Sequence, residues 1–183
     1  AYTGLQALTY YTALTWMPTL YVDAGLTPAQ AGALLAVSTL IGLPIAFFAP
    51  LLALRLRHPG RLAAFVSLVA AGGVLACLWL PSQYLAVGAV LIGIGQAAAF
   101  PLSILFVQLR SDTPAHTAQL AGTAQGIGYL ISAMGPLLVG TLYGVTGAWA
   151  LPAGTLAALL VVQAISGARA GHPEGLGARH HRA

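Results

Sequence analysis

Six long apolar stretches make up most of this chain, and they constrain its fold more than any other feature. They run over residues 1–22, 28–54, 62–80, 84–109, 118–143 and 148–168. An α-helix needs about 20 mostly apolar residues to cross the hydrocarbon core of a bilayer. Because a backbone in lipid must satisfy its hydrogen bonds within the segment, each stretch is expected to be a helix. The sequence therefore predicts an all-α membrane protein with six transmembrane helices.

The seven arginines fall only on alternate connections and on the tail. They follow the second stretch, the fourth stretch and the sixth: Arg55, Arg57, Arg61, Arg110, Arg169, Arg179 and Arg182. This is the positive-inside pattern. We therefore expect a multi-pass protein of the plasma membrane, with these connections and the C-terminus facing the cytoplasm. Aromatic residues gather near the arginine-free ends, as an interfacial belt does: Trp16, Tyr21, Trp79, Tyr84, Tyr143 and Trp149.

The composition excludes several classes of protein. Charged residues are 5% of the chain and hydrophobic residues 58%, which does not fit a soluble domain of this size. The basic residues are divided among three short segments, so topology explains the net charge of +4 better than a nucleic-acid partner does. The chain enters an apolar stretch directly at Ala1, so we expect a longer natural protein. Residues 169–183 hold too little apolar content to fold and are expected to form a disordered cytoplasmic tail.

No set of residues in the stretches suits catalysis or metal binding. The histidines all lie in connections or the tail, as do Asp23 and Asp112, and there is no HExxH motif. The single cysteine, Cys77, permits neither a disulfide framework nor a cysteine-based metal site. We therefore expect no enzyme, no cofactor and no metal ion.

Uncharged polar side chains form stripes on three of the predicted helices. Residues three to four apart share a helical face, which places Gln6 beside Tyr10, Gln96 beside Phe100, and Gln125 beside Tyr129. Hydrogen bonding between helices would explain isolated Ser and Thr residues. Three amides on three helices also suit a solute cavity, because polar groups at membrane depth tend to mark a pathway. The candidate substrate-binding residues are Gln6, Tyr10, Tyr11, Trp16, Gln96, Phe100, Ser103, Gln125 and Tyr129.

Several prolines lie inside the apolar stretches and interrupt the helical hydrogen-bond ladder. The hinge candidates are Pro44, Pro101, Gly135 and Pro136. Static kinks would explain the same residues without any movement.

Four segments resemble a known family of transporters. Residues 4–19 read GLQALTYYTALTWMPT, residues 23–28 DAGLTP, residues 118–129 AQLAGTAQGIGY and residues 146–149 TGAW. These are similar to the cyanate/2-nitroimidazole transporter family of the major facilitator superfamily, and the resemblance covers nearly the whole chain apart from the tail.

A basic turn follows the second stretch, and it resembles the cytoplasmic loop motif of the same superfamily. The turn retains the glycine of that motif and the arginine after it, as Gly60 and Arg61. It departs from the motif at Arg57, where the superfamily has an aspartate.

The resemblance implies that the chain is the C-terminal six-helix half, built of 3+3 repeats, of a twelve-helix transporter. The two halves would close over a central site and give alternating access to a small polar or weakly anionic solute, such as cyanate or a nitroimidazole. It places the first and fourth stretches beside the cavity, and the third and sixth outside it. The implied partners are the solute, the lipid bilayer, the missing N-terminal half and H⁺ as a candidate coupling ion.

No charged residue lies at membrane depth. The counter-charge for an anion would therefore come from the missing half, or the site would bind the anion through amide and hydroxyl donors alone. A titrating group for proton coupling would also come from the missing half. The rings of Tyr10, Tyr11, Trp16 and Phe100 suit a small planar neutral solute equally well. One alternative to a transporter is a six-helix scaffold or assembly module that packs against a partner chain. A channel is a weaker alternative, because the sequence shows no repeated pore signature.

Overall fold

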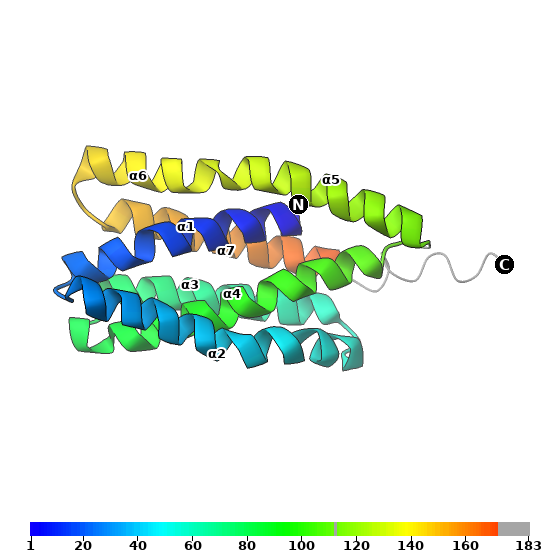
Figure 1. Ribbon diagram of the computed structural model, residues 1–183, viewed down its shortest axis with the longest axis horizontal. Helices are drawn as coiled ribbons and strands as arrows, with labels where there is room; N and C mark the ends of the chain where they lie inside the picture. Colours follow the sequence, from blue (N-terminus) through cyan, green and yellow to red (C-terminus); the bar gives the residue numbers. More distant parts are fainter. Residues whose placement is uncertain (112, 172–183) are drawn as a thin grey trace.

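The computed structural model describes residues 1–111 and 113–171, and all regular structure in this part of the chain is helical. The helices lie side by side as a bundle of long rods (Figure 1). They are α1 (Tyr2–Asp23), α2 (Pro28–Arg55), α3 (Pro59–Trp79), the 3₁₀ turn η1 (Ser82–Tyr84), α4 (Leu85–Gln108), α5 (Pro114–Ser132), α6 (Met134–Thr146) and α7 (Ala150–Ala170). The all-α prediction is confirmed. The expected tail lies outside the described residues from position 172 onward.

Local capping determines where the helices begin. Proline occupies the first turn of α2, α3 and α5, where its missing N–H leaves no hydrogen bond unmade. Thr27 and Gln30 form a capping box, in which the Gln30 N–H donates to Thr27 Oγ1 at 3.3 Å and the Thr27 N–H donates to Gln30 Oε1 at 2.9 Å. Helix α3 therefore starts at Pro59 and α5 at Pro114, a few residues before the apolar stretches do.

The fifth apolar stretch is interrupted near its middle. Helix α5 ends at Ser132, Ala133 lies between, and α6 begins at Met134. Pro136 explains the interruption because it has no N–H to donate to the carbonyl of Ser132, four residues earlier. The two helices still continue as one rod in Figure 1.

Helices α1, α3, α4 and α7 form the centre of the bundle. Helix α3 packs along both α4 and α7, α2 packs on α4, and α5 and α6 pack on α1. Two clusters of buried side chains fill the interior, one around Met17, Val74 and Leu156 and the other around Ala63 and Leu102. The arrangement places α1, α2 and α4 in mutual contact.

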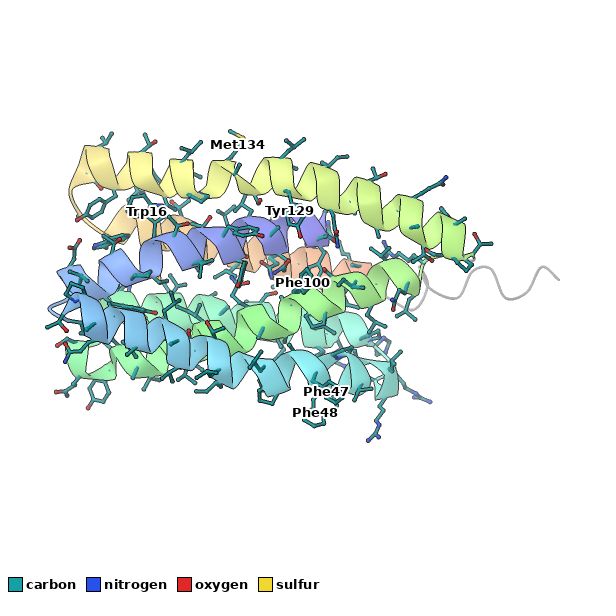
Figure 2. The ribbon with its side chains drawn as sticks, in the orientation of Figure 1. Trp16, Phe47, Phe48, Phe100, Tyr129 and Met134 are labelled. Carbon is teal, nitrogen blue, oxygen red and sulfur yellow. The ribbon has the colours of Figure 1, made fainter. Side chains whose placement is uncertain are left out.

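Apolar side chains also cover the outside of the bundle, as expected of helices that face lipid. Phe47 and Phe48 of α2 and Met134 of α6 point outward (Figure 2). Within the part of the chain that the structure describes, five helical segments are long and apolar enough to cross a membrane, namely α2, α3, η1 with α4, α5 with α6, and α7. Helix α1 is 22 residues long but does not qualify, because Thr, Tyr and Gln residues lower its hydropathy.

The arginine-bearing connections meet at one end of the bundle, on the side where the chain leaves α7 (Figure 1). There the Gly60 N–H donates to the Gly171 carbonyl at 3.4 Å, and Arg110 Nη2 donates to the Arg169 carbonyl at 3.4 Å. Asp23 lies at the opposite end, where it joins α1 to α6 and α7. The arginine-bearing connections thus lie at one end of the bundle and the arginine-free connections at the other. That the arginine-bearing end faces the cytoplasm stays a prediction.

Candidate functional site

A cavity of about 420 Å³ lies between α1, α2 and α4, with Tyr129 of α5 at its margin. This volume is within the range of small-molecule pockets. Six of the nine candidate substrate-binding residues line it: Gln6, Tyr10, Tyr11, Gln96, Phe100 and Tyr129. Helices α3 and α7 contribute no lining residue to it.

Aromatic rings form one wall of this cavity. The rings of Tyr10 and Tyr11 meet edge to face, with centroids 5.4 Å apart, and Tyr11 meets Tyr129 of α5 in the same way at 6.2 Å. Phe100 of α4 also lines the cavity, and Figure 2 shows it and Tyr129 near the middle of the bundle. Such a wall offers flat apolar faces together with phenolic hydroxyl groups.

Gln96 is the most unusual side chain of the cavity. It is 5% exposed, and neither its Nε2 nor its Oε1 reaches a hydrogen-bond partner among the described residues. A buried polar group without a partner costs about 1–3 kcal/mol. Gln6 of α1 lines the same cavity and is also buried. The structure therefore keeps an unpaired amide at the wall of a cavity, at an energetic cost.

Helix α2 supplies cavity residues that the sequence reasoning missed. Ser38, Thr39 and Gly42 all line the cavity. Both hydroxyls donate to the carbonyl of Leu35, at 2.8 and 2.9 Å, so only their oxygen lone pairs remain for a solute. A polar Ser-Thr pair one turn before a glycine, in an otherwise apolar helix, was the available signal.

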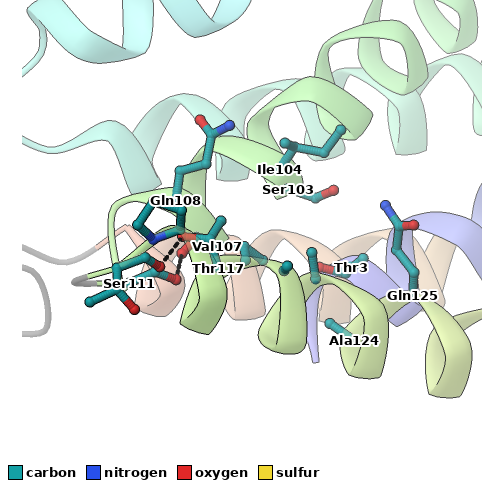
Figure 3. A pocket seen from close by; sticks show the side chains of 13 residues that line it. Thr3, Ser103, Ile104, Val107, Gln108, Ser111, Thr117, Ala124 and Gln125 are labelled. Atoms are coloured by element: carbon teal, nitrogen blue, oxygen red, sulfur yellow. Dashed lines mark hydrogen bonds between the residues drawn. The ribbon is translucent and has the colours of Figure 1, made fainter.

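Two predicted site residues line a different cavity, of about 620 Å³, between α4 and α5 (Figure 3). These are Ser103 and Gln125. The Ser103 hydroxyl donates to the carbonyl of Phe100 at 2.7 Å and is fully buried. The second cavity extends to Ser111 and Thr113, at the arginine-bearing end of the bundle.

Trp16, the remaining predicted site residue, belongs to an aromatic cluster near the arginine-free end. Its Nε1 donates to the carbonyl of Pro136 at 2.9 Å, and its ring packs against Tyr143 and Trp149. The Tyr143 hydroxyl and Trp149 Nε1 both donate to Asp23 Oδ2, at 2.6 and 2.9 Å. These hydrogen bonds, that from Tyr143 first, lower the pKa of Asp23. The cluster joins the ends of α1, α6 and α7.

The hinge candidates have different surroundings. Pro44 and Pro101 lie inside uninterrupted helices, and Pro101 lines the first cavity. Pro136 follows the interruption at Ala133 between α5 and α6, and its carbonyl accepts a hydrogen bond from Trp16 Nε1. Gly135 lies against α1, where a Cβ atom would collide with the Thr12 hydroxyl. A hinge function for any of them stays a prediction.

The candidate loop-motif residues lie in the turn before α3 (Arg57) and in its first turn (Gly60 and Arg61). Arg57 and Arg61 are exposed, whereas Gly60 is buried against α7. A Cβ atom on Gly60 would collide with the Ala168 carbonyl, so helix packing alone requires a glycine there. No group of three His, Cys, Asp or Glu side chains is placed to hold a metal ion within residues 1–111 and 113–171.

A second buried glutamine, Gln163 of α7, differs from Gln96 because its amide is paired. Thr9 Oγ1 donates to Gln163 Oε1 at 2.6 Å, and Gln163 Nε2 donates to Ser67 Oγ at 3.2 Å. The polar stripes found in the sequence did not include Gln163, Ser67 or Thr9, so the sequence reasoning missed this network. Gln163 therefore connects helices through its amide, whereas the amide of Gln96 has no hydrogen-bond partner among the described residues.

The sequence is similar to those of bacterial transporters. It is 33% identical over 169 residues to the uncharacterized transporter YycB of Bacillus subtilis, covering 92% of this chain and 42% of the relative. It is 32% identical over 168 residues to the 2-nitroimidazole transporter of Escherichia coli, with the same two coverages. It is 32% identical over 170 residues to the cyanate transport protein CynX of Escherichia coli, covering 88% of this chain and 43% of the relative.

The chain therefore spans about two fifths of the length of these curated relatives. No family model and no solved structure matches it.

Proposed function

We propose that this chain is one six-helix half of a major facilitator superfamily transporter, and that it forms the C-terminal side of a solute cavity in a secondary transporter. The solute would be small and polar or weakly anionic, similar to cyanate or a nitroimidazole. The N-terminal half would complete the cavity, and the two halves would give alternating access across the plasma membrane. The arginine-bearing end and the C-terminus would face the cytoplasm.

The unpaired amide of Gln96 is the observation that supports this proposal most strongly. Buried amides in a bundle normally find partners, as Gln163 does. An amide left unpaired beside a cavity gains its hydrogen bonds when a polar solute enters, which makes binding more favourable. The adjoining Gln6 and the tyrosine rings would complete the contacts to a small solute.

Any proton coupling would need a titrating group at membrane depth. Within the described part of the cavity wall, the only titratable side chains are Tyr10, Tyr11, Tyr21 and Tyr129. The described lining holds no His, Asp or Glu, which are the residues that usually relay protons at membrane depth. The coupling group, and any counter-charge for an anion, would therefore come from the other half.

Uptake by the full-length protein tests the proposal. Gln6, Tyr10 and Gln96 are each replaced by Ala, and accumulation of 2-nitroimidazole and of cyanate is measured at equal amounts of protein in the membrane. We expect at least one variant to lose most of the uptake, because removing a cavity hydrogen bond typically costs about tenfold or more. The matched control is Gln83→Ala, which removes an exposed amide outside the cavity.

Normal uptake in all three variants would reject the cavity as the solute site. A wild-type protein that accumulates neither solute, yet co-purifies with one defined membrane partner, would support the scaffold alternative.

A further inference from the structure

We infer that the solute of the 420 Å³ cavity presents to this half of the transporter a planar, uncharged edge on which a hydrogen-bond donor lies next to an acceptor, as in primary amides. Gln96 would bind that edge. The inference rests on the proposed function and specifies the substrate class of the same cavity.

The first argument is the state of the Gln96 amide. Its Nε2 is a donor and its Oε1 an acceptor, and both lack partners among the described residues. A solute group with two hydrogen-bond acceptors would accept from Nε2, but it would place its second acceptor oxygen near Oε1, which also only accepts. A group that donates and accepts side by side satisfies both atoms at once. The requirement is the same whichever way the amide is turned, because both of its ends are unpaired.

The second argument is the lack of charge around the cavity. Its lining residues include no Arg, His, Asp or Glu. The described arginines lie toward the end of the bundle where the chain leaves α7. An anion entering this part of the cavity would lose water without gaining an opposite charge from the described chain, which is costly. A neutral edge with two hydrogen bonds avoids that cost.

The third argument is the shape of the wall. Tyr10, Phe100 and Tyr129 offer ring faces and edges that favour a flat solute. A cavity of this volume accommodates a single small ring with its substituent. Helix α2 approaches α4 through Gly42, which leaves only small atoms on that side.

Access to Gln96 requires a local movement, because both amide atoms are covered in this state. The side chain must turn toward the cavity when the solute arrives. Since no hydrogen bond to a described residue has to break first, that turn costs less than it would for Gln163.

Three probe molecules of similar size and shape distinguish which hydrogen-bonding groups the cavity prefers. Benzamide carries a donor and an acceptor, nitrobenzene carries two neutral acceptors, and benzoate carries two acceptors with a negative charge. Their dissociation constants are measured by calorimetry on purified full-length protein at pH 7. We expect benzamide to bind at least about tenfold more tightly than nitrobenzene, and benzoate to bind most weakly, because an acceptor-only edge leaves Oε1 unpaired.

The Gln96→Leu variant tests the residue. It keeps the approximate size and removes both polar atoms, so the preference for benzamide over nitrobenzene should disappear. Gln83→Leu, the matched control at an exposed position outside the cavity, should retain it. Tightest binding of benzoate, an unchanged order of affinities in Gln96→Leu, or binding of none of the three probes would each overturn the inference. Solute uptake that still depends on Gln96 would leave the proposed function standing in those cases, so the two failures are distinguishable.

Discussion

Thr9 of α1 donates its hydroxyl hydrogen to Gln163 Oε1 of α7 at 2.6 Å, and both residues are almost completely buried. The other end of the same amide donates to Ser67 Oγ of α3, and that hydroxyl donates to the carbonyl of Ala63 at 2.8 Å. Three helices are thus connected through one side chain. The network fixes α1 against α3 and α7, while an adjoining face of α1 lines the cavity.

Replacing Gln163 by Leu should destabilise the bundle, because it removes the hydrogen bonds that connect this side chain to Thr9 of α1 and Ser67 of α3. The Thr9 hydroxyl would then donate only to the Gln6 carbonyl of its own helix, at 3.2 Å. Hydrogen bonds between membrane helices contribute about 0.5–2 kcal/mol, so we expect a lower melting temperature of the purified protein. Gln119→Leu, at an exposed position of α5, provides the control and should leave the melting temperature nearly unchanged. Equal melting temperatures for Gln163→Leu and the wild type would contradict a structural function for this network.

Replacing Gln96 by Leu should have the opposite effect on stability. Its amide has no partner among the described residues, so an apolar side chain of similar size removes an unmade hydrogen bond and should stabilise the protein by about 1 kcal/mol. Solute uptake should fall in the same variant. Thermal unfolding and uptake, measured on one preparation, check both halves of this prediction. A strongly lowered melting temperature would show that Gln96 is paired in the folded protein and would remove the main support for the site.

Asp23 should make the stability of the arginine-free end depend on pH. Hydrogen bonds from Tyr143 and Trp149 lower the pKa of its carboxyl group in the folded protein. A lowered folded pKa contributes stability that is fully present above the ordinary aspartate pKa of about 4, and that is lost as the pH falls through the lowered value. The melting temperature should therefore decrease in acid, and Asp23→Asn should show a smaller decrease over the same range. An identical pH profile for both proteins would exclude this contribution.

The two buried glutamines also show how far sequence reasoning could reach. The approximate extent of most helices and the faces that carry Gln6 and Gln96 follow from local hydropathy and a period of 3.6 residues, so they could be predicted. The early starts of α3 and α5 and the break between α5 and α6 were not predicted. Gln163 and Gln96 occupy similar apolar surroundings in the sequence, and nothing local distinguishes the paired amide from the unpaired one. The distinction depends on Thr9 and Ser67, which are contributed by other helices. Trp16 illustrates the same point, because its partner Pro136 lies 120 positions away in the chain.

Two glycines of α6 allow a matched test of how closely this helix must approach α1. A Cβ atom on Gly135 would collide with the Thr12 hydroxyl and lie 3.1 Å from the Leu8 carbonyl, whereas a Cβ atom on Gly144 would meet nothing within 4 Å. Alanine favours a helix over glycine by about 1 kcal/mol at either position. We therefore expect Gly144→Ala to leave the melting temperature unchanged or raise it. Gly135→Ala should lower it, because overpacking costs about 1–3 kcal/mol and pushes α6 away from α1. If both variants stabilise the protein equally, the close contact at Gly135 does not hold α6 in place.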